Sequence, residues 1–230
     1  MRTYDQYCSV ARALDLIGDR WTLLIVRELL IRGPSRYTDL QYGLPGIATN
    51  LLADRLRELE ADGLVTKEMA PPPVATTLFR LTARGESLES VLAALGRWGA
   101  PLLVGPSGGA TFRSHWLKFP LELYLSDHRP NDEPVSIEIH TGEQPMLVDV
   151  AEGVVRVHPG STANPNATLT GTPSLILGVL VGMLDIETAR ARGLKIGGDI
   201  ETLRRVQPVI PSTPVNKRLP TKARSKNRTR

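Results

Sequence analysis

The sequence has one cysteine, Cys8, and few aromatic residues, 5% of 230. A single cysteine excludes an intrachain disulfide and any metal site that needs several thiolates. The four histidines are scattered, with no i, i+4 pair among them, so we expect no bound metal and no other cofactor. Gly197-Gly198 is not followed by the lysine and Ser/Thr of a phosphate-binding loop, and the chain shows no catalytic constellation. We therefore expect that the protein is not an enzyme.

Long hydrophobic runs are missing as well. The longest, residues 175–184, is interrupted by Gly178 and Gly182 and is shorter than the ~20 residues that span a bilayer. The chain begins Met1-Arg2-Thr3 without an apolar signal segment, which predicts a cytoplasmic protein with no membrane partner. Hydrophobic content of 41% and charged content of 23% are typical of a soluble globular protein, and the length allows two domains.

The excess of basic residues is confined to the C-terminus. The net charge is +4, but residues 217–230 hold seven basic groups and no acidic one. The charges of residues 1–105 cancel, because this part of the chain has 12 basic and 12 acidic groups. An argument for DNA binding must therefore depend on where individual charges lie. We expect residues 208–230 to form a basic, flexible tail that adds salt-sensitive DNA affinity or only aids solubility.

The stretch behind the Pro45-Gly46 turn carries the clearest functional pattern. Leucines recur there at helical spacing and predict a helix with one apolar face: Leu52, Leu56 and Leu59. The opposite face is polar and includes the first turn: Thr49, Asn50, Asp54 and Arg57. Gly63 stands where a helix C-terminus favours a residue with positive φ.

The elements around this helix follow the order of a winged helix-turn-helix. A short helix from Ser35 or Arg36 to Leu40 precedes the turn. Two β-prone runs, residues 64–69 and 77–81, follow the helix with a Pro-rich link between them and predict a hairpin wing. We therefore expect the helix behind Pro45-Gly46 to enter the DNA major groove, where its first turns read base edges.

Ten side chains are candidates for DNA contact. Those of the helix face base edges or phosphates, those near residue 36 hold a phosphate, and those of the wing reach the backbone or minor groove. The set is Arg36, Tyr37, Thr49, Asn50, Asp54, Arg55, Arg57, Thr76, Thr77 and Arg80. Arg55 lies on the flank of the helix, nearer the core, and is assigned to the DNA backbone. The alternative is a solvated helix face beside an ordinary hairpin.

Three further helices complete the N-terminal half. The first covers residues 8–17, and the second covers residues 20–31 with Asp19 as its N-cap. The third is capped by Thr82 and runs to about residue 98 with an apolar stripe: Leu88, Val91, Leu92, Leu95 and Trp98. A terminal helix with such a stripe needs a surface to bury it, and a partner subunit is one answer, together with the first helix.

The C-terminal half follows a linker, residues 100–109. Its β-prone segments are residues 121–125, 135–141, 146–150, 154–158 and 166–170. Helices are expected over residues 174–184, from the N-cap Asp185 to Arg192, and from behind Asp199 to about residue 206. These elements form either the plain core of an α+β domain or a pocket for an apolar effector. The candidate pocket residues are Leu123, Leu125, Ile137, Leu147, Leu175, Ile176, Val179, Leu180 and Met183.

The N-terminal half resembles the HxlR-type family of bacterial winged helix-turn-helix regulators. The resemblance rests on Cys8 to Ile25 (Cys-Ser-Val-Ala-Arg-Ala-Leu-Asp-Leu-Ile-Gly-Asp-Arg-Trp-Thr-Leu-Leu-Ile), Leu44-Pro45-Gly46-Ile47, residues 52–65 and Phe79-Arg80-Leu81-Thr82. It implies a homodimeric transcription regulator that binds double-stranded DNA. One departure is Ala48, where relatives usually have a Ser helix cap, so Thr49 or Asn50 must supply that function.

The resemblance also bears on Cys8, because some relatives sense oxidants through a disulfide across the dimer. The residues leave a plainer interpretation open, a small and partly buried side chain in the first helix. A reactive thiol needs a lowered pKa and access, and Arg12 is the one evident cation near it in the sequence.

Residues 110–207 resemble the sterol-carrier-protein-2-like fold, a curved sheet covered by helices. The resemblance rests on residues 167–173, the apolar helix, residues 189–193 and Ile196-Gly197-Gly198-Asp199. The expected class is therefore α+β, with an N-terminal winged helix-turn-helix domain (1–104), an SCP2-like α/β sandwich (110–207) and the tail.

The sequence predicts a homodimeric DNA-binding transcription regulator on a palindromic operator, with an apolar effector or partner at its C-terminal domain. The alternative function is a lipid or small-molecule binder whose N-terminal half serves only for dimerisation.

Overall fold

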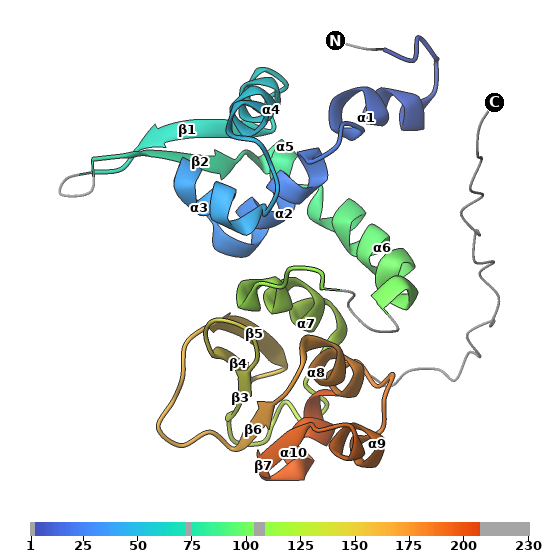
Figure 1. The fold of residues 1–230 in the computed structure, drawn as a ribbon, viewed down its shortest axis with the longest axis vertical. Coiled ribbons are helices and arrows are strands. Elements are labelled where there is room, and N and C mark those ends of the chain that lie inside the picture. The colour runs from blue at the N-terminus through green and yellow to red at the C-terminus, as the bar shows by residue number, and fades with distance from the viewer. Residues whose placement is uncertain (1–2, 72–74, 104–108, 208–230) are drawn as a thin grey trace, which may run out of the picture.

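A computed structural model describes residues 3–71, 75–103 and 109–207 (Figure 1). The expected tail, residues 208–230, and residues 104–108 of the expected linker lie outside the described residues. The N-terminal elements are, in order, α1 (Ser9–Ile17), α2 (Thr22–Arg32), α3 (Tyr37–Gly43), α4 (Thr49–Ala61), β1 (Val65–Met69), β2 (Thr77–Leu81), α5 (Ala83–Glu86), α6 (Glu89–Gly99) and the 3-10 helix η1 (Ala100–Leu103).

The second half forms a five-stranded sheet with helices. Its elements are the 3-10 helix η2 (Ser114–Leu117), α7 (Lys118–Tyr124), β3 (Val135–His140), β4 (Met146–Ala151), β5 (Val154–Pro159), β6 (Ala167–Thr170), α8 (Pro173–Leu180), α9 (Ile186–Ala191), β7 (Lys195–Gly198) and α10 (Ile200–Val206). The strand order is β5-β4-β3-β6-β7, and only the β3–β6 pair is parallel. The predicted α+β class, a winged helix-turn-helix followed by an SCP2-like sheet and helices, is confirmed.

The helix-turn-helix is held by an apolar core beneath α4. Leu52, Leu56 and Leu59 are buried on one side of that helix, as their spacing predicts, and pack with residues of α2 and α3 such as Ile25 and Leu40. Gly63 follows α4 with φ +68°, the left-handed conformation that glycine adopts without strain. The β1–β2 hairpin then projects beside α4 as the wing (Figure 1).

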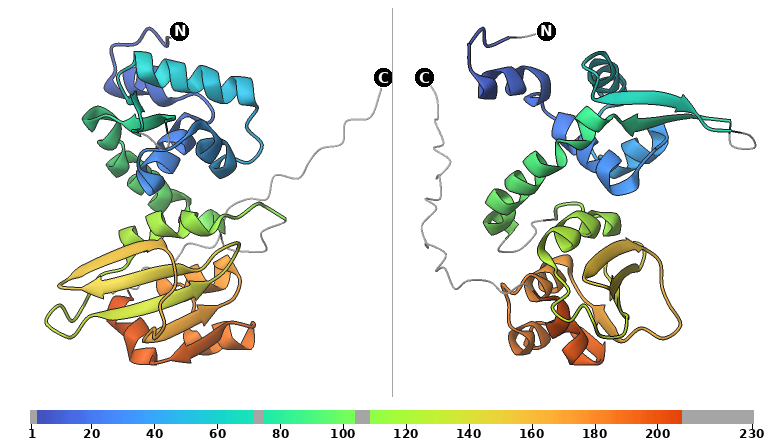
Figure 2. Two further views of the ribbon diagram at one scale, coloured as in Figure 1. Left: turned by 90° about the vertical axis from the view of Figure 1, so that its left-hand side faces the viewer. Right: turned by 180° about the vertical axis from the view of Figure 1, so that it is seen from behind.

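The core of the C-terminal half lies between the sheet and its helices. In β3, Ile137 and Ile139 point to the same face, and the register aligns Ile137 with Val148 and Ala167. These side chains share one cluster with Ile176 and Val179 of α8. Helices α8, α9 and α10 therefore cover this face of the sheet (Figure 2).

One expected strand is wrong. Residues 121–125 are not β, because α7 covers Lys118–Tyr124. Leu117, Leu121 and Leu125 recur every fourth residue and are all buried. The segment is helical because a helix buries these three leucines on one face, which outweighs its β-propensity. Pro120 is tolerated because it falls in the first turn, where its missing N–H has no helical acceptor.

Two expected helix caps are also wrong. Asp19 does not cap α2, whose N-cap is Trp21 with φ +83°. Neither Thr49 nor Asn50 caps α4; its N-cap is Ala48, and among the described residues no side chain accepts from its first turn. Thr49 and Asn50 are the first two helical residues, so their side chains remain at the surface.

Two expected helices are shorter than predicted. The helix behind Thr82 is split into α5 and α6, although Thr82 does cap α5 by accepting a hydrogen bond from the N–H of Gly85. The helix of residues 174–184 ends at Leu180, because the chain turns at Gly182 with φ +72°. Asp185 caps α9 as predicted, accepting from the N–H of Thr188.

Candidate nucleic-acid interface

The solvent face of α4 carries the polar residues expected there. Asn50 and Arg57 are exposed, with 68% of the Arg57 side chain accessible, while the leucines of the opposite face are buried. The guanidinium of Arg57 forms an ion pair with Asp54 one turn earlier. A surface ion pair of this kind contributes little to stability, so Arg57 can exchange Asp54 for another acceptor.

The start of α3 is tied to the start of α4. The Tyr37 hydroxyl donates to the backbone carbonyl of Thr49, and the Arg36 backbone N–H donates to Asp39 Oδ2 at 3.1 Å. The first bond joins the first helix of the motif to the second, and the other closes the first turn of α3. Arg36 itself is exposed beside the wing, and within the described part of the chain its guanidinium forms no ion pair.

A cleft of about 580 Å³ lies between the start of α3 and the wing. Four expected contact residues line it (Arg36, Tyr37, Thr76 and Thr77), together with Thr38, Lys67 and Phe79. Sequence reasoning missed Lys67. The strand register pairs Lys67 with Phe79, and its ammonium group lies 5.8 Å from the Phe79 ring centroid and contacts Glu60. Two cations at one cleft suit a phosphate group.

Arg80 and Arg55 lie apart from this cleft. Arg80 is exposed on β2 and forms an ion pair with Glu68 at 3.3 Å. Arg55 is only 19% exposed and contacts Asp19 and Glu58, on the side of α4 that faces a second cleft beside α1. Its buried Nε has no partner among the described residues. This placement takes Arg55 away from Asn50 and Arg57.

Cys8 is exposed and directly precedes α1. The backbone N–H groups of Ala11 and Val10, at the start of α1, lower the pKa of the Cys8 thiol. The thiol therefore meets the requirement for access, and its pKa is shifted in the direction that favours the thiolate. The expectation of a buried side chain at this position is not met.

Helices α1 and α6 both lie on the side of the N-terminal half opposite the wing (Figures 1 and 2). They carry exposed apolar side chains, here called the apolar surface of α1 and α6: Val10, Leu14, Val91, Leu95 and Trp98. Exposed apolar residues that gather in one region often mark a protein–protein contact. The stripe expected behind residue 88 is thus present and is largely uncovered within the described chain.

The candidate pocket residues of the C-terminal half fall into three groups. Leu125, Ile137, Ile176, Val179 and Leu180 are buried in one core cluster, against which Leu175 packs. Leu147 is aligned with Glu138, so it points to the opposite face of the sheet. Met183 is 48% exposed, and Leu123 is partly exposed on α7. The sheet therefore separates Leu147 from the other buried members.

The described residues hold no group of three or more His, Cys, Asp or Glu side chains suited to a metal. None of the described helices is long and apolar enough to cross a membrane. Residues 105–109, Gly-Pro-Ser-Gly-Gly, match the letters of the Gly-x-Ser-x-Gly nucleophile pattern. That pattern acts in a strand-to-helix turn, whereas η1 precedes it here and Ser107 lies outside the described residues.

Both halves match known families. The HxlR-like helix-turn-helix family matches residues 16–104, and the SCP-2 sterol transfer family matches residues 129–211. An uncharacterised HTH-type transcriptional regulator of Synechocystis is 34% identical over 96 residues, which are 42% of this chain and 70% of that protein. The chain therefore belongs to the HxlR-like family of helix-turn-helix transcription regulators, and carries an SCP2 domain behind the family's own.

Two further relatives add detail. The HTH-type transcriptional regulator YodB of Bacillus subtilis is 33% identical over 86 residues, covering 37% of this chain and 76% of YodB. An uncharacterised HTH-type regulator of Mycobacterium tuberculosis is 39% identical over 136 residues, covering 59% of this chain and 78% of that protein. A match of that length extends beyond residue 104, so the likeness includes part of the second half. The crystal structure of diamide-treated YodB has a TM-score of 0.36 at 30% identity, covering 42% of this chain and 95% of that one.

Proposed function

We propose that this protein binds double-stranded DNA as a homodimer and regulates transcription from a palindromic operator. The proposal is carried by one observation: α4 exposes Asn50 and Arg57 opposite a buried leucine face, next to a cleft that holds Arg36 and Lys67. The division into residues 1–104, 110–207 and 208–230 is part of this proposal.

In the proposed complex, α4 lies in the major groove. Asn50 pairs with adenine, and Arg57 leaves Asp54 to pair with guanine or hold a phosphate. Arg36 and Lys67 hold a phosphate at the cleft, and Thr76, Thr77 and Arg80 follow the backbone along the wing. Arg55 is not part of the proposed interface, because its side chain is only 19% exposed and lies on the side of α4 that faces the cleft beside α1.

The dimer is proposed to form through the apolar surface of α1 and α6. Burying exposed Val10, Leu95 and Trp98 against a second copy removes apolar area from water. Two copies related by a twofold axis present two α4 helices, and operator palindromy would mirror that symmetry. An apolar effector at the SCP2 domain would act only through different affinity for two states of this dimer.

The test is DNA binding measured by fluorescence anisotropy with the region upstream of the protein's own gene. We expect Arg57→Ala to weaken binding by about 1–3 kcal/mol, the usual contribution of a base contact. Arg204→Ala is the matched control, because Arg204 is also an exposed arginine paired with an acidic residue three positions earlier, but on α10. We expect the control to bind like the parent protein.

The salt dependence of DNA affinity distinguishes a DNA-binding regulator from the lipid-binding alternative. A DNA-binding regulator loses affinity steeply as salt rises, since phosphate contacts release counterions. Salt-insensitive or absent DNA binding, together with tight binding of a fatty ligand, would favour the lipid-binding alternative. Equal affinity of Arg57→Ala and the parent protein would remove Arg57 from the interface.

A further inference from the structure

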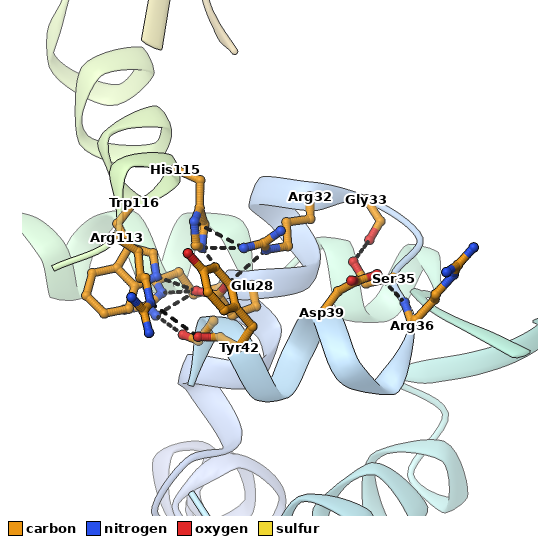
Figure 3. A network of polar contacts seen from close by, with 12 residues as sticks. Glu28, Arg32, Gly33, Ser35, Arg36, Asp39, Tyr42, Arg113, His115 and Trp116 are labelled. Carbon is orange, nitrogen blue, oxygen red and sulfur yellow. Dashed lines mark hydrogen bonds and ion pairs between the residues drawn. The ribbon is translucent and has the colours of Figure 1, made fainter. Parts of the chain in front are cut away.

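A fully buried carboxylate lies at the boundary between the two halves. Glu28 is in the middle of α2, a mostly apolar helix, and its side chain is completely buried. Four groups surround its oxygens: Trp116 Nε1 and Arg27 Nη2 at 2.7 Å, His115 Nε2 at 2.8 Å and Arg32 Nε at 3.2 Å (Figure 3). A buried charge is tolerated only when it is paired in this way.

The pKa of Glu28 reflects both effects. Burial raises it, but the hydrogen bond with His115 and the charge of Arg27 act in the opposite direction, and the net result is a lowered pKa. Glu28 is therefore an anion whose charge is neutralised from both halves. His115 and Trp116 belong to η2, the first element of the C-terminal half, and are 87 and 88 residues away in the sequence.

Glu28 also touches the end of α3. Gly43 closes that helix, and a Cβ at this position would come within 1.9 Å of Glu28 Oε2. The chain passes directly from Gly43 into the turn that leads to α4. The carboxylate thus lies between the helix-turn-helix on one side and η2 on the other.

A second set of contacts reaches the sheet of the C-terminal half. Arg113 stacks on the Tyr42 ring, with its guanidinium carbon 4.3 Å from the centroid, and pairs with Glu143 in the β3–β4 turn. The Tyr42 hydroxyl donates to the same carboxylate. Ser114 Oγ donates to the carbonyl of Thr141 at 2.7 Å and accepts from the N–H of Glu143 at 3.0 Å. The β3–β4 turn is thereby bonded to η2 and to the end of α3.

We propose that Glu28 is a positioning residue that joins the SCP2 domain to the helix-turn-helix, so that the β3–β4 turn sets the orientation of α3 and thereby the operator affinity of α4. This inference rests on the proposed function. Undocking the domain would leave the Glu28 carboxylate without two of its donors, so the docked and undocked arrangements are distinct states rather than a continuum. A ligand or partner that alters the β3–β4 turn would change DNA affinity by this route, and DNA would act back on the turn.

The test uses the full chain with Glu28→Gln, which keeps the shape and removes the charge, and with His115→Gln and the double variant. Hydrogen exchange of the α3 amides reports docking, and anisotropy reports operator affinity. We expect Glu28→Gln to speed α3 exchange and weaken operator binding, each by about tenfold. Trp116→Phe, which removes one donor and keeps a ring, is the milder variant should Glu28→Gln fail to fold.

The double variant distinguishes the proposed junction from a role of Glu28 that is confined to α2. If Glu28 and His115 act on each other across the junction, their effects on α3 exchange are non-additive. Asp127→Asn is the matched control, since it disrupts another buried ion pair inside the C-terminal half and should leave α3 exchange unchanged. Additive effects, or α3 exchange that Glu28→Gln leaves unchanged, would overturn the proposal. If the parent protein binds no DNA, the proposed function fails, and the exchange data still decide whether the junction ties the halves.

Discussion

At the scale of single residues, the C-terminal half contains a buried ion pair with a definite pH signature. Arg205 Nε and Nη2 lie 2.8 and 3.0 Å from the two carboxylate oxygens of Asp127, and both side chains are almost fully buried. The guanidinium of Arg205 is the largest cause of the lowered pKa of Asp127, about 2 in the folded protein. The ion pair joins the segment that follows α7 to helix α10.

The first prediction at this scale concerns Arg205→Met. Removing one partner leaves a buried carboxylate unpaired, so we expect a loss of about 3–5 kcal/mol in the free energy of unfolding at neutral pH. The unfolded pKa of Asp is about 3.9, above the folded value, so the ion pair stabilises fully above that pH. Its contribution is lost as the pH falls towards about 2.

Urea unfolding at a series of pH values measures this effect. The difference between Arg205→Met and the parent should be largest near pH 7 and should shrink below about pH 4. Arg204→Ala, at the neighbouring exposed position, is the control and should stay within about 0.5 kcal/mol of the parent. A difference that does not vary with pH would mean that lost packing, not charge, explains the variant.

At the scale of elements, the sequence predicts most of the winged helix-turn-helix because its evidence is local. The leucine spacing of α4, the Pro45-Gly46 turn and Gly63 all act within a few residues. The strand expected at residues 121–125 is wrong because Leu117, Leu121 and Leu125, four residues apart, bury one face of a helix, and this packing outweighs the β-propensity of the segment.

Long-range contacts could not be predicted in this way. Glu28 sits in an apolar helix with no local sign that His115 is its partner, since no periodicity links positions 87 residues apart. Lys67 joins the cleft only through the β1–β2 register, which the Pro-rich link does not specify. Of the candidate interface, the sequence therefore predicts the face of α4 and four of the residues that line the cleft, but not that Lys67 joins them.

A prediction at this scale concerns the joint between the wing and α5. Thr82 Oγ1 accepts from the N–H of Gly85 at 3.1 Å and donates to the carbonyl of Gly63 at 2.7 Å. We expect Thr82→Ala to lower the free energy of unfolding by about 1 kcal/mol, the usual effect of removing an N-cap. Thermal unfolding measures the loss, with Thr66→Ala on the exposed side of β1 as the control. Equal loss in both variants would argue that strand propensity, not the cap, is responsible.

At the scale of the whole molecule, the two sides of the N-terminal half differ in what they leave exposed. The wing and α4 present charged and polar side chains, while α1 and α6, which lie on the other side (Figure 2), present exposed apolar ones. The symmetric dimer proposed above would use the apolar surface of α1 and α6 and leave both α4 helices exposed. The junction at Glu28 would then place one SCP2 domain on each subunit in a fixed orientation.

The last prediction concerns this assembly. Leu95 is 47% exposed on α6, and Met183 is 48% exposed in the C-terminal half, so the two form a matched pair of exposed apolar side chains. We expect Leu95→Asp to shift the protein from dimer to monomer, because an interface that buries a carboxylate without a partner is destabilised. Met183→Asp should leave the mass unchanged. Sedimentation equilibrium measures the mass of each variant.

The monomer would also bind the operator more weakly, since it engages one half-site where the dimer engages two. A Leu95→Asp protein with the mass of the parent dimer would place the subunit interface elsewhere.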